Sequence, residues 1–334
     1  MERMKLCKIV GGSKLFGTDR PESDNDYLGI FVPTAQELLG LENPPTEWSL
    51  GTKVSGEQRN TNEDTDYTLF SLRQFITEAA AGQSQKLEML FAPRDKWIES
   101  SEAWELLVEN RGLFLSTRGV APFLGFAIKQ AYKATVKGAH LSLIRSVLTA
   151  AEQDGQRRKG PLRNHLRFSD YDELGNPAPG TCMFYGKTMD FLKNDQGYPM
   201  VRIGGREYDI GKPTAEFLKS LEHLEGRYGS RVEAAADKGY DYKSVMHCMR
   251  QLFEAEEFLT TGVISLPRPE KERAFLMTIR GEQWPNMSPD DFLKYVMKEK
   301  DRIEQEVMPK SQLPQRPNRG ELSKICAYIH SLNL

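Results

Sequence analysis

The stretch between Gly11 and Gly29 combines residue types and spacings that suggest catalysis. Asp24 and Asp26 lie two positions apart at the start of an apolar run, so an extended backbone places both carboxylates on one side. At the roughly 6–7 Å spacing of such a pair, the charges repel by about 2–3 kcal/mol at an effective dielectric near 20. Hard oxygen ligands suit Mg²⁺, and two such ions can activate an attacking hydroxyl and stabilise a leaving pyrophosphate. The aspartates therefore predict a site for Mg²⁺ or Mn²⁺.

A small polar turn precedes these acids. Gly12 and Ser13 follow a short apolar run, and Lys14 comes directly after them. Backbone N–H groups and a hydroxyl in such a turn can hold phosphate oxygens. An Asp-x-Asp pair by itself is usually a solvated turn, but the ordered combination of strand, Gly-Ser, Gly17 and Asp-x-Asp is much more specific. Gly12, Ser13 and Lys14 are therefore candidate nucleotide-binding residues.

The elements that must position these residues change in character along the chain. Strands are predicted at 6–10, 26–32 and 66–70, with an exposed loop at 51–65 and a helix at 72–81. Beyond about residue 93, amphipathic segments predict helices at 102–109, 123–134, 141–153, 214–227, 242–259 and 289–307. Residues 200–203 and 206–210 flank Gly204-Gly205 and predict a β-hairpin.

Composition limits the class of protein. The 334 residues predict two domains, and 39% hydrophobic with 28% charged residues excludes a wholly disordered chain. With 45 Lys and Arg against 47 Asp and Glu, the net charge of −2 excludes a strongly basic coat but allows a local basic groove. The cysteines Cys7, Cys182, Cys248 and Cys326 show no metal-ligand spacing, which is typical of reduced thiols. With no leader or transmembrane pattern, a cytoplasmic protein without a membrane partner is expected. P-loop, zincin and α/β-hydrolase motifs do not occur.

The stretch from residue 11 to residue 29 resembles the signature of the DNA polymerase β nucleotidyltransferase superfamily, Gly-Ser followed about ten residues later by Asp-x-Asp. More narrowly, the chain is similar to the RNA repair pathway DNA polymerase β family of predicted nucleotidyltransferases. The likeness excludes roughly 140–235 and departs from the family at 82–85, where Gly-Gln-Ser-Gln stands for the usual Gly-Asn-Pro. Outside the signature it extends over the segments 67–75, 87–91, 241–252, 261–267 and 313–317.

The resemblance implies an α+β fold. A nucleotidyltransferase catalytic domain with a mixed sheet would occupy 1–115, and a mainly helical domain would occupy 116–334. The second domain would carry a polar insert at 154–180 and the hairpin at 200–210. The resemblance also implies a third carboxylate on a strand beside Asp-x-Asp. Asp66 opens the strand before a helix and is the preferred candidate, while Asp64 and Glu88 remain alternatives.

Two further groups of polar residues can be interpreted either as solvated surface or as binding sites. Lys243, His247, Arg250 and Glu254 share one face of the helix at 242–259. Such a face is usually solvated, but in this family Lys243, His247 and Arg250 are candidates for nucleotide binding. A basic cluster in the polar insert is usually a solvated loop, and its alternative role is contact with nucleic acid; it consists of Arg157, Arg158, Lys159, Arg163 and Arg167.

Taken together, the residues and the resemblance predict a Mg²⁺-dependent nucleotidyltransferase that uses a nucleoside triphosphate (NTP). It would transfer a nucleoside monophosphate to an acceptor hydroxyl, an RNA 3′ end such as that of cleaved tRNA, and release pyrophosphate. Asp24, Asp26 and Asp66 would act as catalytic and metal-binding residues. One alternative keeps this chemistry but nucleotidylates a protein hydroxyl, as in some toxin–antitoxin pairs. Another is a non-catalytic RNA- or nucleotide-binding module.

Overall fold

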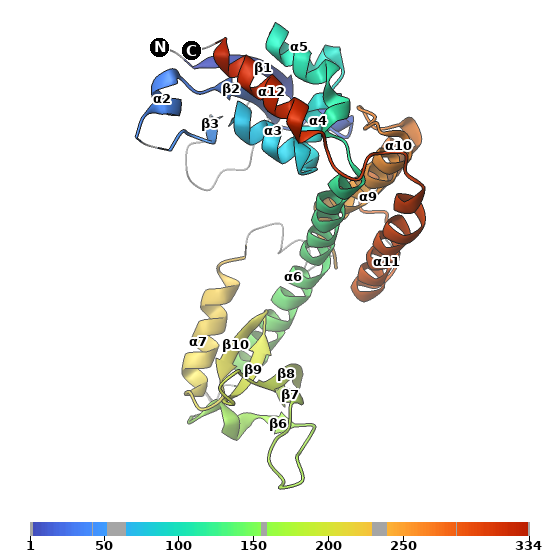
Figure 1. Cartoon of the computed structure of the whole chain (residues 1–334). Coiled ribbons are helices and arrows are strands. Elements are labelled where there is room, and N and C mark those ends of the chain that lie inside the picture. The colour runs from blue at the N-terminus through green and yellow to red at the C-terminus, as the bar shows by residue number, and fades with distance from the viewer. Residues whose placement is uncertain are drawn as a thin grey trace. The chain divides into compact units, whose positions relative to one another are not determined.

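The computed structural model describes residues 3–41, 43–51, 65–154, 159–228, 239–284 and 286–332 (Figure 1). The chain forms two compact units. Unit 1 comprises Met1–Lys129, Met246–Asn286 and Lys294–Leu334, and unit 2 comprises Gln130–Val245 and Met287–Leu293. The sequence alone suggests one boundary near residue 115, whereas unit 1 also contains two C-terminal segments. The mixed α+β fold class predicted from the sequence is confirmed.

Unit 1 contains a five-stranded mixed sheet in the order β3-β4-β2-β1-β5. Strands β2 and β4 run parallel, and the other neighbouring strands are antiparallel. The predicted strands are present, and the two that sequence reasoning missed are the short edge strands β3 and β5, whose largely exposed residues give no apolar run. The strands are β1 (Met4–Val10), β2 (Asn25–Val32), β3 (Glu47–Gly51), β4 (Thr65–Ser71) and β5 (Trp97–Ser100).

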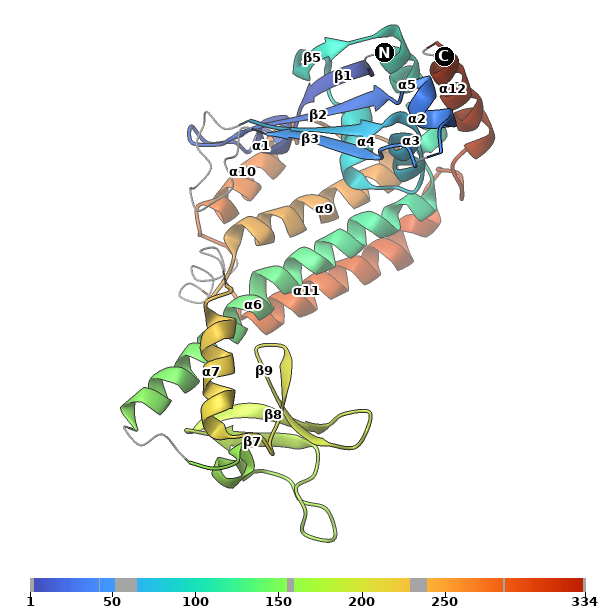
Figure 2. The ribbon, with the colours of Figure 1, turned by 90° about the vertical axis from the view of Figure 1, so that its left-hand side faces the viewer.

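The buried half of this sheet anchors the strand ends that carry the acids. Residues 28–32 of β2 are continuously buried, while its first residues are only partly covered. Helices α3 (Leu72–Ala80) and α5 (Glu102–Glu109) pack on the sheet (Figure 2). Phe75 of α3 and Trp104 of α5 meet edge to face. Helix α12 (Arg319–Ser331) packs on α3. The remaining elements of the first hundred residues are α1 (Gly12–Phe16), α2 (Ala35–Leu39) and α4 (Ser84–Phe91).

The long helices differ from prediction in three places. Residues 121–153 form one helix, α6 (Ala121–Gln153), and not two, because a single glycine at 138 costs only about 1 kcal/mol in a helix interior. Helix α11 (Pro289–Arg302) gives way to a π-helical segment, Ile303–Val307. Helix α10 (Glu270–Arg280) was not predicted, since it is highly charged and buries only Leu276 and Ile279. Helix α9 (Tyr242–Thr261) agrees closely with its prediction.

Unit 2 contains an antiparallel sheet in the order β10-β9-β8-β7-β6, together with α7 (Thr214–Glu225). The predicted hairpin is present, and Gly204 and Gly205 both adopt the positive φ of a tight two-residue turn. Strand β8 alternates buried and exposed residues, the pattern of a strand with one face on a core, yet sequence reasoning missed it. The strands are β6 (Arg167–Phe168), β7 (Gly180–Phe184), β8 (Lys187–Lys193), β9 (Pro199–Ile203) and β10 (Arg206–Asp209).

Among the helices that the structure describes, none combines the length and the apolar character needed to cross a bilayer.

Candidate active site

Three carboxylates meet at one edge of the unit 1 sheet. Asp24 and Asp26 lie at the start of β2, and Asp66 lies near the start of β4. Because β2 and β4 are parallel and in register, Asp26 stands directly opposite Asp66. One oxygen atom from each of the three aspartates lies within 4.8 Å of the others, and all three residues are half-buried. The two strand starts therefore build an acidic cluster from residues about 40 positions apart in the sequence.

The electrostatics of this acidic cluster favour a cation. Two full negative charges 4.8 Å apart repel by about 3 kcal/mol at an effective dielectric of 20. Carboxylate oxygens are the ligands that Mg²⁺ takes at 2.0–2.1 Å, so opposite ligands of one octahedral ion lie about 4 Å apart. The limit of 4.8 Å on the separations of the three oxygen atoms is slightly above that span. The donor set and its spacing therefore fit Mg²⁺ or Mn²⁺.

The Gly-Ser turn lies directly against Asp26. Gly12 has φ +58°, and a Cβ atom there would lie 1.9 Å from Asp26 Oδ2. The backbone N–H of Gly11 donates to the Asp26 carbonyl at 2.8 Å, which ties the turn to β2. Only glycine satisfies both the positive φ and the close approach of the carboxylate. These contacts therefore bring the Gly-Ser turn and Asp26 into one site.

Ser13 and Lys14 form the first turn of the short helix α1. The helix ends at Gly17, whose φ of +68° is left-handed, and the N–H of Thr18 donates to the Ser13 carbonyl. The Lys14 ammonium donates to Asn25 Oδ1 at 2.6 Å, so this cation lies beside the residue between the two aspartates. Ser13 and Lys14 are both half-buried. The predicted phosphate-binding residues are thus assembled on one side of the acidic cluster.

The segment between this turn and Asp24 is held by the end of α10. The Arg280 guanidinium donates to the Thr18 carbonyl and, at 3.3 Å, to Ser23 Oγ. Arg20 donates in turn to the Arg280 carbonyl. Burial, together with the charge of Arg20, lowers the pKa of Arg280 from its ordinary value. Arg280 at the end of α10, 262 residues beyond Thr18, therefore holds the segment that leads to the acidic cluster, a contact that sequence reasoning missed.

A cavity of about 390 Å³ opens beside Asp26 and Asp66. Its wall includes the aromatic ring of Tyr67 and residues of β3. Tyr67 donates to the Cys7 carbonyl at 3.4 Å, and burial raises the pKa of its hydroxyl well above the ordinary value. The dipeptide Asp-Tyr occurs at 26–27 and again at 66–67 in the sequence. The two copies pair in register on β2 and β4, so this repeat could have predicted which residues line the cavity.

Arg250 belongs to a buried polar network and does not face this cavity. Its guanidinium donates to Glu88 Oε1 and Glu254 Oε1, both at 2.8 Å, and is only 6% exposed. It also lies 3.6 Å from the centre of the Phe16 ring, at the end of α1. The expectation that Arg250 contacts nucleotide phosphate does not agree with this position. Arg250 instead connects α9 and α4 with the helix that carries Ser13.

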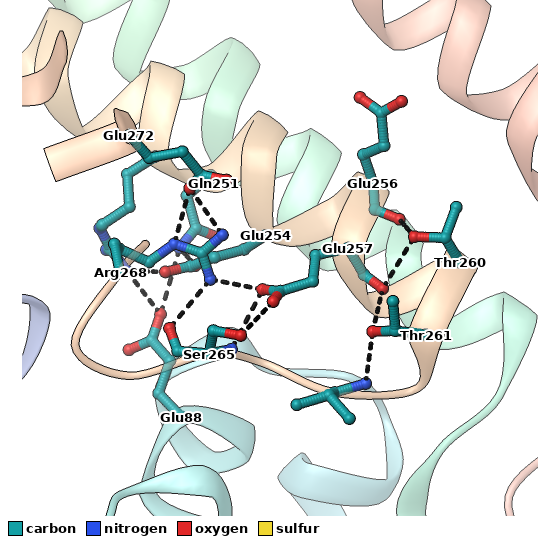
Figure 3. A network of polar contacts seen from close by, with 12 residues as sticks. Glu88, Gln251, Glu254, Glu256, Glu257, Thr260, Thr261, Ser265, Arg268 and Glu272 are labelled. Atoms are coloured by element: carbon teal, nitrogen blue, oxygen red, sulfur yellow. Dashed lines mark hydrogen bonds and ion pairs between the residues drawn. The ribbon is translucent and has the colours of Figure 1, made fainter. Parts of the chain in front are cut away.

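The same network accounts for Glu88 and extends into α10. The Gln251 amide donates to Glu88 and Glu254, while the fully buried Arg268 donates to Glu257 and Glu272 (Figure 3). Two arginines, Arg250 and Arg268, thus donate hydrogen bonds to four carboxyl groups. Burial raises the pKa of Glu254 to about 8. The positive charge of Arg250 lowers this pKa, and the negative charge of Glu88 raises it. Glu88 is therefore bound within this network, whereas Asp66 lies in the acidic cluster. The other alternative, Asp64, lies outside the described residues.

The remaining predicted residues lie on α9 and in unit 2. Lys243 is exposed and lies in the part of α9 assigned to unit 2, and His247 is half-buried in unit 1. In unit 2, Lys159, Arg163 and Arg167 are exposed, as a basic surface requires. Arg157 and Arg158 lie outside the described residues. The roles proposed for all of these residues stay predictions.

The comparisons agree with the class that the fold and the acidic cluster indicate. Residues 6–164 match the RNA repair pathway DNA polymerase beta family, and this segment carries Gly12, Ser13 and the acidic cluster. This segment is therefore similar to that family of polymerase-β-like nucleotidyltransferases. The C-terminal segments from residue 241 onward, which also resemble the family, lie beyond the matched residues.

The chain is also similar to a phage protein. It is 29% identical over 304 residues to an uncharacterized 38.9 kDa protein of the nrdC–mobD intergenic region in Enterobacteria phage T4, and the match covers 87% of each chain. No solved structure matches the chain.

Proposed function

We propose that this protein is a Mg²⁺-dependent nucleotidyltransferase that transfers a nucleoside monophosphate from an NTP to an RNA 3′ hydroxyl. The observation that carries the proposal is the convergence of Asp24, Asp26 and Asp66 within 4.8 Å, against a glycine turn that only an unsubstituted Cα can form. A purely binding module has no need to gather like charges next to a phosphate-binding turn.

The residues of the chain take distinct roles in this proposal. Asp24 and Asp26, together with Asp66, hold the cations. When bound, Mg²⁺ neutralises the triphosphate and stabilises charge on the attacking and leaving oxygens. The N–H groups of the Gly12-Ser13 turn and the Ser13 hydroxyl bind phosphate oxygens. These contacts position the α-phosphorus of the NTP beside the acids.

In this proposal Asp66 acts on the acceptor. It borders the cavity beside the sheet and so can accept the proton of a hydroxyl bound there. The new bond joins the acceptor oxygen to the α-phosphorus, and the bond to the bridging oxygen breaks, so pyrophosphate leaves. RNA is proposed as the acceptor because the family belongs to RNA repair pathways.

The test is transfer of label from α-³²P NTPs to a single-stranded RNA in the presence of Mg²⁺, with pyrophosphate measured in parallel. We expect labelled RNA from the wild type and none from the Asp24→Asn/Asp26→Asn variant. Asp95→Asn is the matched control, because it removes an exposed carboxylate elsewhere in unit 1 and should leave transfer unchanged. Release of no pyrophosphate with any NTP and acceptor would refute the proposal. Label on protein instead of RNA would refute only the RNA acceptor.

A further inference from the structure

A pocket lined by aromatic and basic residues lies in unit 2, outside the acidic cluster and its turn. It has a volume of about 420 Å³ and is bounded by the ends of β6, β8 and β9 and by the loop that precedes β7. The residues of its wall that matter here are Arg163, Asn164, Phe168, Asn176, Phe191 and Lys193.

The floor of the pocket is an aromatic pair. Phe168 and Phe191 meet edge to face, with ring centroids 4.8 Å apart. Phe191 belongs to the hydrophobic core of unit 2, while Phe168 packs against that core and is only half-buried. The core therefore fixes the orientation of a partly accessible ring before any ligand arrives. Stacking of a nucleobase on such a ring stabilises binding regardless of base identity.

The rim of the pocket carries cations on a rigid backbone. Arg163 is exposed, and its backbone N–H donates to the Ile210 carbonyl at 2.8 Å, which ties this residue to the segment after β10. Lys193 is also exposed, at the end of β8. Arg163 and Lys193 thus flank the aromatic floor from two different elements. If a nucleobase stacks on the aromatic floor, Arg163 and Lys193 can attract the phosphate groups on either side of that nucleotide.

The amide groups of the rim suit a nucleobase edge. Asn176 is oriented by Asp172, which accepts from its backbone N–H at 2.8 Å and from its side-chain amide at 3.4 Å. Asn164 supplies a second amide. Amide donors and acceptors are complementary to the Watson–Crick edge of an unpaired base. The hydrogen bond from the Asn176 backbone N–H and, more weakly, the charge of Lys193 lower the pKa of Asp172, so the rim is not uniformly positive.

We infer that this pocket binds one unpaired nucleotide of a single-stranded RNA, with the base on Phe168 and the adjoining phosphates on Arg163 and Lys193. Sequence-independent capture of an RNA end or loop follows, because stacking and phosphate contacts read no particular base. A duplex does not fit this mode, since its bases stay stacked and paired. The inference rests on the proposed function in one respect, that RNA is the substrate of the protein.

The test measures binding of a fluorescein-labelled 12-nucleotide RNA to the full chain by anisotropy, across a range of salt concentrations. We expect Phe168→Leu, which keeps an apolar side chain on the core, to weaken binding at least fivefold. Arg163→Gln/Lys193→Gln should lower the slope of log K against log salt by about 1.4, or 0.7 per phosphate lost. The matched control is Arg206→Gln/Lys219→Gln, because it removes two exposed cations from β10 and α7 of the same unit.

Several results would overturn the inference. Wild-type affinity in both pocket variants would exclude the pocket, and an equal loss in the control variant would show only diffuse charge attraction. A duplex that binds as tightly as the single strand, or a mononucleotide that competes as well as the 12-mer, would also contradict it. Failure of the proposed function is separable: the Asp24→Asn/Asp26→Asn protein should still bind the RNA normally. If the wild type transfers no label but still binds RNA through the pocket, only the proposed chemistry is refuted.

Discussion

Unit 1 contains two groups of acids that lie in opposite environments. In the acidic cluster, Asp24, Asp26 and Asp66 are half-buried beside a cavity and converge on one another. In the buried network, Glu88 and Glu254 are 4% and 0% exposed and both accept from Arg250. The two groups are connected through α1, because Gly12 contacts Asp26 at one end and Phe16 contacts Arg250 at the other.

This difference separates positioning from chemistry. Removing one partner of a buried ion pair leaves an uncompensated charge, so such groups act mainly on folding. Like charges at a solvent-accessible edge are a cost that a bound cation can relieve, so such groups act on ligand binding. The same residue type therefore predicts opposite phenotypes: substitution in the acidic cluster should remove activity and spare stability, and substitution in the network should do the reverse.

The sharpest test compares Asp66→Asn with Glu88→Gln. We expect Asp66→Asn to lower nucleotidyl transfer on the order of 10³-fold, because stabilisation by a bound metal amounts to several kcal/mol. Its Tm without metal should equal or exceed that of the wild type, since one like charge is removed. The Tm increase that Mg²⁺ produces should disappear, while Glu88→Gln should keep that increase on a lower baseline. A metal response lost in Glu88→Gln and kept in Asp66→Asn would reverse the assignment of the third carboxylate.

The next largest effect is expected at Arg250. Arg250→Met should lower the free energy of unfolding by about 3–5 kcal/mol, because Glu88 and Glu254 lose their shared cation inside the protein. Arg302→Met is the matched control, since Arg302 also bonds two carboxylates, Glu256 and Glu299, but at the surface. That change should cost about 1 kcal/mol or less. Urea denaturation of both variants measures the difference, and equal losses would show that burial does not set the strength of these pairs.

The acidic cluster could be predicted from the sequence because its signals are local. Gly12, Ser13 and the Asp-x-Asp pair lie within 15 residues. The third carboxylate was implied by the family resemblance, and Asp66 was preferred among the candidates because it opens the next strand. The network could not be predicted, because Arg250 meets Glu88 across 162 residues and periodicity alone shows only a polar face. The edge strands β3 and β5 were missed for a related reason, since exposed strands carry no continuous apolar run. The hydrogen bond from Arg280 to the Thr18 carbonyl could not be predicted either, because the two residues are 262 positions apart.

A smaller effect is expected from Gly12→Ala. The added Cβ meets Asp26 Oδ2, and the positive φ costs a further 1–2 kcal/mol or so for a residue with a side chain. We expect the turn to shift away from the acid and to bind the triphosphate less well. Each 1.4 kcal/mol or so of transition-state stabilisation lost in this way lowers the rate of transfer about tenfold, so a decrease of roughly tenfold is expected. Gly125→Ala is the control, because it lies in α6 with open space around its Cα and should be neutral or slightly stabilising. Normal KM for the NTP and normal transfer in Gly12→Ala would contradict the proposed role of the turn.

The smallest effect is a pH dependence that arises from Glu254. Burial raises its pKa to about 8, so the folded protein retains a proton that the unfolded chain releases near its ordinary value of 4.5. The stability contributed by this proton is complete below the unfolded pKa and is lost as the pH rises through the folded pKa. Glu254→Gln mimics the protonated form, so wild-type stability should fall relative to the variant from about pH 5 to pH 8 and then level off. The total change should be no more than a few kcal/mol, because Arg250 and Arg268 oppose it. Urea midpoints at several pH values measure it, with the exposed Glu321→Gln as a control that should follow the wild type at every pH. A difference that grows as the pH falls would mean that Glu254 is ionised in the folded protein, and that the four acids of the network share their two arginines as full charges.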